Sequence, residues 1–264
     1  SSAVVYADNM RCIMSQLFRS RPLPARMRLL LFISALLSLP ALPLSATVNQ
    51  VALHEEFADL ANWEPVTFPK IARHSSYEAR QTETENYLVA QSSGSASAIR
   101  YIHEFDVYRY PVVRWRWKVD NVYAKGNLQE KAGDDYPLRV YVMFKYDPAA
   151  ASFGEQVQYG LAKMVYGAYP PHSSLNYIWA SRGEEQGIHP SPYTDKARLL
   201  VLRAGSVDAG KWVEEKVNIL EDYRKAFGTQ PPATASIAIM NDSDNTGEAA
   251  TSYIDYIRVE EEQK

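Results

Sequence analysis

Two segments of the chain alternate strictly between apolar and polar residues, and this pattern limits what the chain can fold into. In "VVRWRWKVD", residues 112–120, the apolar side chains fall on one side and the charged ones on the other. In "PLRVYVMF", residues 137–144, the same alternation continues for eight residues. Successive side chains of a β-strand point to opposite faces, so both segments are predicted to be strands with one buried face.

Further strands are predicted wherever short apolar runs end in turn residues. The candidates are "SLNYIWASR", "ARLLVLRAG", "KWVEEKVNI", "ASIAIMND" and "TSYIDYIRVE", and also "NYLVAQSS" and "SAIRYIHEFDV", which we expect to pair across the small, polar "SSGSAS". Many short strands separated by Gly, Pro, Asn and Asp indicate an all-β fold. We predict a two-sheet, antiparallel, jelly-roll-like β-sandwich with one or two short helices.

The helices are predicted from two interruptions of the alternation. In "NILEDYRKAFG", apolar residues recur at helical spacing, Asn218 can cap the start and Gly228 can end the helix. Residues 152–165 form either a second helix or a mobile loop.

The N-terminal 46 residues are expected to lie outside the folded domain. Residues 1–26 form an upstream, disordered segment without a fold signal. Residues 27–46 have a positive start, an apolar run and a small residue at Ala46, the pattern of a signal peptide. Residues 47–264 then form a single β-sandwich domain, exported to the periplasm or secreted. An uncleaved membrane anchor is the alternative.

Composition narrows the chemistry. The only cysteine, Cys12, precedes the predicted cut, so the exported chain has no disulfide and no thiol site. The formal net charge is −3 and the leader is rich in arginine, so the exported part is more acidic. We therefore expect no nucleic-acid partner, and no stable membrane insertion after cleavage.

The charged side of the two alternating strands is the candidate ligand-binding surface. We expect Arg114, Arg116 and Arg139 to share one sheet face, with Asp134 or Asp135 at its rim. Arginine's planar fork suits carboxylates, and aromatic side chains suit sugar rings, so Tyr141 and Tyr177 complete the predicted site. Because like charges repel, this face is wet, internally paired or completed by an anionic ligand.

A second motif, "IMNDSDNTG", offers oxygen ligands for a hard cation such as calcium. The predicted metal ligands are Asp242, Asp244 and Asn245. No glutamate follows at the spacing of an EF-hand, and an Asx-rich turn is the alternative reading. Glu56, Asp59 and Asp255 form another possible cation position, where the two terminal strands are expected to meet.

Enzyme signatures are scarce. The sequence has no Gly-x-Ser-x-Gly, no His-Glu-x-x-His and no phosphate-binding loop, and its five histidines are isolated. No catalytic residue is predicted. Carboxylate pairs for glycoside cleavage are invisible in a sequence, and Asp134 or Asp135 with Asp242 or Asp244 would be such a pair.

The ordered segments "VVRWRWKVD", "GDDYPLRVYVMF", "LNYIWAS", "SPYTDKARLLVLRAG", "KWVEEKVNILEDYRKAFG" and "IAIMNDSDNT" resemble the domain-of-unknown-function 3047 family of exported bacterial proteins. The resemblance covers roughly residues 55–260 and implies export and a jelly-roll-like fold, but no catalytic residue. In this chain the motif "NDSDNT" begins with Asn241, where the family pattern has an aspartate.

The leading functional prediction is a non-catalytic carbohydrate-binding module for a saccharide or cell-envelope glycan, with an acidic saccharide favoured by the arginines. The alternatives are a glycan-active hydrolase or lyase using paired carboxylates, and a structural cell-envelope protein.

Overall fold

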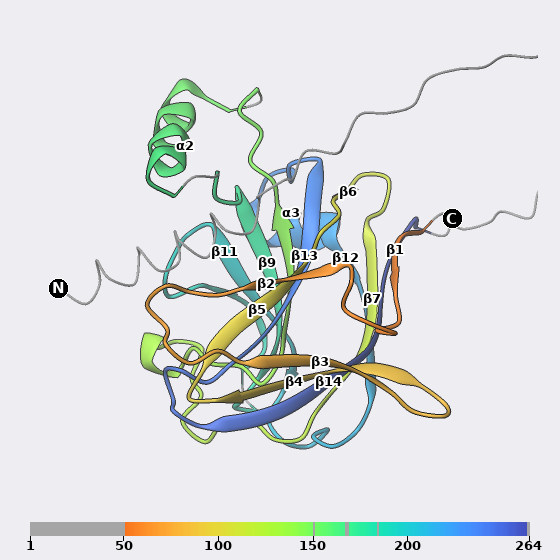
Figure 1. Cartoon of the computed structure of the whole chain (residues 1–264). Helices are drawn as coiled ribbons and strands as arrows, with labels where there is room; N and C mark the ends of the chain where they lie inside the picture. The colour runs from red at the N-terminus through yellow and green to blue at the C-terminus, as the bar shows by residue number, and fades with distance from the viewer. Residues whose placement is uncertain (1–50, 150, 167–168, 184, 263–264) are drawn as a thin grey trace, which may run out of the picture.

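The computed structural model describes residues 51–149, 151–166, 169–183 and 185–262, and these build an open two-sheet β-sandwich (Figure 1). Sheet A contains β1 (Val51–Glu55), β3 (Ser76–Gln81), β4 (Asn86–Ser93), β7 (Val112–Val119), β12 (Val213–Asn218) and β14 (Ala249–Glu260). Sheet B contains β2 (Trp63–Val66), β5 (Ala96–Tyr101), β6 (Phe105–Asp106), β8 (Arg139–Phe144), β9 (Ser173–Ala180), β10 (Gly187–Pro190), β11 (Ala197–Ala204) and β13 (Thr234–Asp242). The predicted fold class is confirmed.

The order of the strands differs from the order in the sequence. Sheet A runs β12-β7-β14-β4-β3, with β1 beside β14, and sheet B runs β10-β11-β9-β8-β13-β5-β2, with β6 beside β13. Neighbouring strands are antiparallel except β9 and β11, which pair in parallel. As expected, the two terminal strands meet, since Val51 of β1 lies opposite Glu260 of β14.

The core lies between the inner faces of the sheets. Trp115 and Trp117 of β7 are fully buried, and their rings stand edge to face with centroids 5.5 Å apart. Each packs against an aromatic side chain of β9 across the sandwich, Trp115 on Tyr177 and Trp117 on Trp179. The prediction that both tryptophans face the core while Arg114 and Arg116 face outward is confirmed.

The helices begin and end where the sequence suggests. In α3 (Ile219–Phe227), the Asn218 side chain accepts hydrogen bonds from the first-turn amides of Leu220 and Glu221, and Gly228 ends the helix with a φ of 72°. The segment left open between helix and loop is helical, as α2 (Phe153–Tyr166). A 3₁₀ turn, η1 (Lys131–Gly133), precedes β8.

One predicted pairing is wrong. The segments "NYLVAQSS" and "SAIRYIHEFDV" do not form a hairpin, because β4 pairs with β3 and β14 in sheet A whereas β5 pairs with β2 and β13 in sheet B. The connection between them turns at Gly94, whose φ of 54° suits a residue without a Cβ, and crosses from one sheet to the other. The predicted leader and Cys12 lie outside the described residues. None of the described helices is long and apolar enough to cross a membrane.

Candidate functional site

The three predicted binding arginines do not share a face. Arg114 and Arg116 lie on β7 in sheet A, whereas Arg139 lies on β8 in sheet B. Both strands turn their apolar side to the same core, so their charged sides point in opposite directions, away from the sandwich. The expectation of one arginine-lined sheet face is therefore wrong.

Arg139 belongs to a buried network of charges at one end of sheet B. Its Nε donates to Asp242 Oδ1 at 2.9 Å, and its Nη2 both contacts Asp242 Oδ2 and donates to the main-chain oxygen of Asp134 at 2.8 Å. The Tyr136 hydroxyl donates to Asp134 at 2.8 Å, and the Tyr136 ring lies 4.4 Å from the guanidinium carbon. Arg139 is 5% exposed and meets its counter-charges within the chain, so its guanidinium is buried and internally paired.

Burial controls the acid–base behaviour of this network. It raises the pKa of Asp134 to about 6, although the neighbouring Arg139 acts in the opposite direction. It also raises the pKa of Asp242 well above its usual range, and the pKa of Asp244 to a smaller extent. Several carboxylates thus share one guanidinium in a place where isolated negative charge is costly.

Asp242 and Asp244, together with the neighbouring Asp135, could hold a metal ion. One carboxylate oxygen each from Asp135, Asp242 and Asp244 lies within 4.8 Å of the other two. Asp135 replaces the predicted Asn245, whose main-chain and side-chain amides instead donate to Asp135 Oδ1 at 3.3 and 3.0 Å. The third carboxylate of the candidate metal group therefore comes from the turn before β8, about 110 residues away in the sequence. The local motif alone could not predict that Asp135 lies there.

The other predicted cation position is not assembled. Asp255 forms an ion pair with Arg116, with 2.8 Å between its carboxylate and Arg116 Nε, and Asp59 accepts a hydrogen bond from the main-chain amide of Ala61. Among the described residues, the only group of acids and histidines close enough to hold an ion is the Asp135 group.

Tyr177 and Tyr141 have different surroundings from those predicted. Tyr177 is fully buried between the sheets, and its hydroxyl donates to Asp222 of α3 at 2.9 Å, so its assignment to a binding surface is wrong. Tyr141 is half-buried on the outer face of sheet B, in the row that also contains Asn176 of β9.

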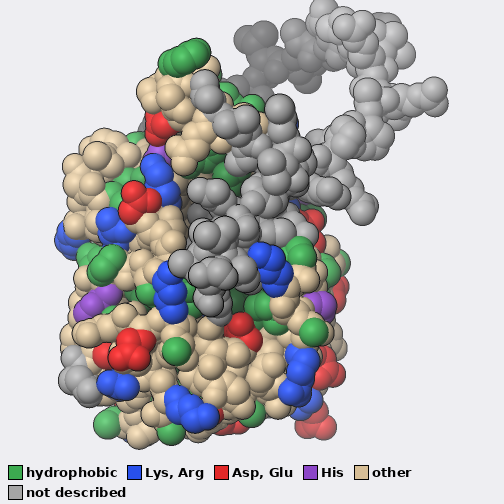
Figure 2. Space-filling model, turned by 90° about the vertical axis from the view of Figure 1, so that its left-hand side faces the viewer, with side chains coloured by type: hydrophobic (Ala, Val, Ile, Leu, Met, Phe, Trp, Pro, Cys, Tyr) green, Lys and Arg blue, Asp and Glu red, His purple; other side chains and the backbone are tan. Residues whose placement is uncertain are grey.

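The outward arginines of β7 are paired with acids of neighbouring segments. Arg114 Nε contacts Glu260 at 2.6 Å, and Arg116 contacts Asp255 at 2.8 Å and Glu85 at 3.3 Å. Both side chains stay about one quarter to one third exposed, at 26% and 34%. Charges of both signs are also interspersed on the side of the molecule shown in Figure 2.

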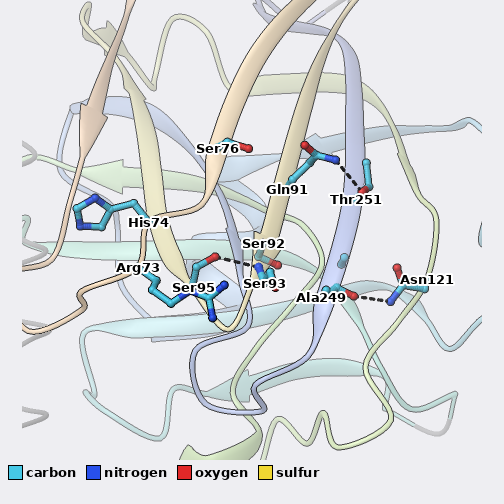
Figure 3. A pocket seen from close by; sticks show the side chains of 11 residues that line it. Arg73, His74, Ser76, Gln91, Ser92, Ser93, Ser95, Asn121, Ala249 and Thr251 are labelled. Atoms are coloured by element: carbon cyan, nitrogen blue, oxygen red, sulfur yellow. Dashed lines mark hydrogen bonds between the residues drawn. The ribbon is translucent and has the colours of Figure 1, made fainter.

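A polar pocket of about 440 Å³ opens at the end of sheet A away from these arginines (Figure 3). The sequence did not single out any of its residues. Its lining consists of Arg73, His74, Ser76, Gln91, Ser92, Ser93, Ser95, Asn121, Ala249, Ala250 and Thr251. These residues come from the segment before β3, from β3 and β4, from the turn after β4, from the segment after β7, and from β14.

The pocket walls are held by hydrogen bonds that leave polar atoms available. The Gln91 amide donates to Thr251 Oγ1 at 3.2 Å, and the Asn121 amide donates to the main-chain oxygen of Ala249 at 3.0 Å. Figure 3 shows Arg73 extending towards the turn that follows β4. Arg73 is exposed, and its guanidinium makes no ion pair with the residues that the structure describes.

The pocket also adjoins the acidic network. Ser95 and Ser243 exchange hydrogen bonds, with the Ser243 amide donating to the Ser95 oxygen at 2.9 Å. The Ser92 hydroxyl bonds to Tyr123, whose hydroxyl also reaches the Asn241 side chain. The turn that carries Asp242 and Asp244 therefore supports one wall of the pocket.

Several solved structures share features of this fold at very low sequence identity. A mannan-recognising carbohydrate-binding module, TmCBM27, is 10% identical, with 81% of this chain and 99% of that chain covered and a TM-score of 0.35. The family 30 carbohydrate-binding module of the Clostridium thermocellum cellulase Cel9D-Cel44B is 10% identical over 76% and 95% of the two chains, with a TM-score of 0.37. Endoglucanase 3 of Trichoderma harzianum, from family GH12, is 7% identical over 76% and 98%, with a TM-score of 0.36.

The comparison with curated proteins finds no match. The family model for the protein of unknown function DUF3047, in contrast, matches residues 61–258, which include the strands of both sheets from β2 to β13, most of β14, and both helices. This match spans most of the chain, in agreement with the resemblance noted in the ordered sequence segments, and the protein therefore belongs to the DUF3047 family.

Proposed function

We propose that this protein is an exported, periplasmic or secreted β-sandwich that binds an acidic saccharide of the cell envelope without cleaving it. The observation that carries the proposal is the composition of the sheet A pocket. Hydroxyl, amide and guanidinium groups make up most of its lining. Sugars are recognised by such hydrogen-bonding groups, and a planar guanidinium can bind the carboxylate of an acidic sugar with two parallel hydrogen bonds.

The same lining supports binding rather than cleavage. Hydrolysis by the two-carboxylate mechanism requires two acids roughly 5 to 10 Å apart on either side of the glycosidic bond. The pocket lining contains no aspartate or glutamate among the described residues. Of the acids that do cluster, Asp135 and Asp242 are buried; Asp242 pairs with Arg139, and Asp135 accepts hydrogen bonds from Asn245 and Thr246.

A glycan array probed with the purified protein tests this proposal. We expect binding to uronic-acid polymers, and we expect Arg73→Met to abolish it while preserving the melting temperature. Arg224→Met is the matched control, because Arg224 is an exposed arginine on α3 outside the pocket. Retained binding in Arg73→Met, or no signal from any acidic glycan, would refute the assignment.

We further propose that the ion held by Asp135, Asp242 and Asp244 is Ca²⁺. Carboxylate oxygens suit hard cations, whereas zinc sites usually include nitrogen or sulfur ligands. Because a ligand of the folded state stabilises it by mass action, chelation should lower the melting temperature. Asp244→Asn should remove that difference while sparing the Arg139–Asp242 pair. An unchanged melting temperature at saturating Ca²⁺ would instead indicate that the acids balance their charge with protons.

A further inference from the structure

The surface of sheet A continues from the pocket into an aromatic patch. Thr251, in the pocket wall, and Tyr253 are two residues apart on β14 and therefore point to the same outer face. Tyr253 lies opposite Lys118 of β7, and the amide of Asp120 on the same segment donates to the Thr251 oxygen. The pocket and this part of the face are thus joined through two neighbouring strands.

The aromatic patch consists of Tyr87, Trp212 and Tyr253, from β4, the segment before β12, and β14. Each pair of rings stands edge to face, with centroids 5.9 to 6.2 Å apart. All three side chains are half-buried on the outer face, where they form no part of the core between the sheets. The patch is therefore a structured part of the surface.

This patch holds the ammonium group of Lys118 in place. Lys118 Nζ lies 4.1 Å from the Tyr253 ring centroid and 5.2 Å from that of Trp212. Contacts of a cation with ring faces are attractive, and two of them restrict a side chain that would otherwise be flexible. A cation that is ordered in advance loses less entropy when it binds an anion.

Lys118 differs from the neighbouring cation in its lack of an acidic partner. Arg116 also lies over Trp212, at 5.0 Å, but it pairs with Asp255 and Glu85. Lys118 makes no ion pair with any residue in the part of the chain that the structure describes. The nearby Asp120 accepts a hydrogen bond from the Tyr253 hydroxyl at 2.9 Å. Lys118 is thus a half-buried, positioned cation available to an anionic group.

The spacing of the two unpaired cations indicates the length of a ligand that reaches both. Arg73 lies beside Gly94, next to the strand pair Ser93–Ala249, and Lys118 lies opposite Tyr253. Four residues of a strand separate Ala249 from Tyr253, about 14 Å at the usual rise per residue. A single sugar unit in the pocket cannot contact both positions.

We propose that Lys118 forms a second anion-binding position, so that the ligand is an extended saccharide chain carrying several carboxylates rather than one acidic sugar. This inference rests on the proposed function, because it assigns Arg73 to one end of the same site. Trp212 and Tyr253 act as positioning residues that hold the Lys118 ammonium over the face.

Calorimetric titration with oligogalacturonates of two and six units tests the inference. We expect the six-unit chain to bind at least tenfold more tightly than the two-unit chain. Lys118→Met approximates the length of the side chain and removes its charge. It should lower the affinity for the six-unit chain about five- to tenfold, the equivalent of about 1 kcal/mol. The same variant should leave the two-unit affinity unchanged. Lys216→Met, an exposed lysine on β12 of the same sheet, should change neither.

Variants of the patch separate a positioning role from a purely structural one. Tyr253→Phe retains the ring and should retain the preference for length. Trp212→Leu should reduce the six-unit affinity alone, with a melting temperature close to that of the parent protein. Equal affinity for both lengths, or a six-unit affinity that Lys118→Met leaves unchanged, would overturn the inference and leave the pocket assignment standing. Absence of binding at both lengths would contradict the proposed function itself.

Discussion

Removal of the Arg139 guanidinium should destabilise the fold strongly, because it leaves buried acids without their counter-charge. The Arg139→Met substitution retains most of the aliphatic volume but removes both contacts to Asp242 and the two contacts to Asp134, one to its main-chain oxygen and one to its carboxylate. Asp242 is 1% exposed and Asp134 is 3% exposed, so water cannot replace the lost partner without local opening. Breaking a buried pair in this way costs about 3 to 5 kcal/mol, a large part of the 5 to 15 kcal/mol typical of a folded domain.

Urea unfolding in a chelating buffer, followed by tryptophan fluorescence, measures this loss, since Trp115 and Trp117 report on the core. The exposed Arg224→Met variant should change the free energy of unfolding by less than about 0.5 kcal/mol. The double variant Arg139→Met with Asp242→Leu should be more stable than Arg139→Met alone, because it no longer leaves the buried Asp242 carboxylate without a counter-charge. A loss below about 1 kcal/mol for Arg139→Met would refute the conclusion that the network is dry and internally paired.

Three further predictions address the core, the acids and a helix cap. Trp115→Ala should lower the free energy of unfolding by about 3 to 5 kcal/mol in the same assay, as expected for a fully buried aromatic side chain. Since burial raises the pKa of Asp134 from its ordinary value to about 6, this group stabilises the fold below about pH 4, and the contribution disappears as the pH rises through 6. In chelator, the parent protein should therefore lose stability between about pH 4 and 6, and Asp134→Asn should lose less; equal losses would contradict the shift. Asn218→Ala should cost about 1 kcal/mol in thermal unfolding, because the first-turn amides of α3 lose their acceptor, and an unchanged melting temperature would indicate that another group replaces it.

Alternation along single strands predicted much of the fold. It identified the buried side of β7 and β8 correctly, and the capping residues of α3 followed from local chemistry. It also placed Tyr177 on the side of Leu175 and Trp179, which are buried, so the information against Tyr177 as a ligand contact was already present in the pattern. The error was to select it for its residue type.

The arrangement of strands in space was less accessible to prediction. A sandwich has two outer faces, and alternation shows that Arg114 and Arg139 point outward without showing that they lie on opposite sheets. The meeting of Asp135 with Asp242, and of Gln91 with Thr251, joins residues more than 100 positions apart. Such contacts depend on which strands pair, a choice made by packing of the whole chain rather than by any local pattern.

The last two strands have a consequence for the time course of folding. β13 lies between β8 and β5 in sheet B, and β14 lies between β7 and β4 in sheet A, so the final segment of the chain fills a central place in both sheets. Until that segment is available, β8, β5, β7 and β4 each lack a partner on the side that faces it, and these unpaired edges invite association with other chains. Most pairings are distant in sequence, which predicts slow folding and a late, concerted closure of both sheets. The partly folded chain is therefore prone to aggregation until residues 234–260 have paired with both sheets. A truncation within these residues should yield aggregates rather than a smaller sandwich.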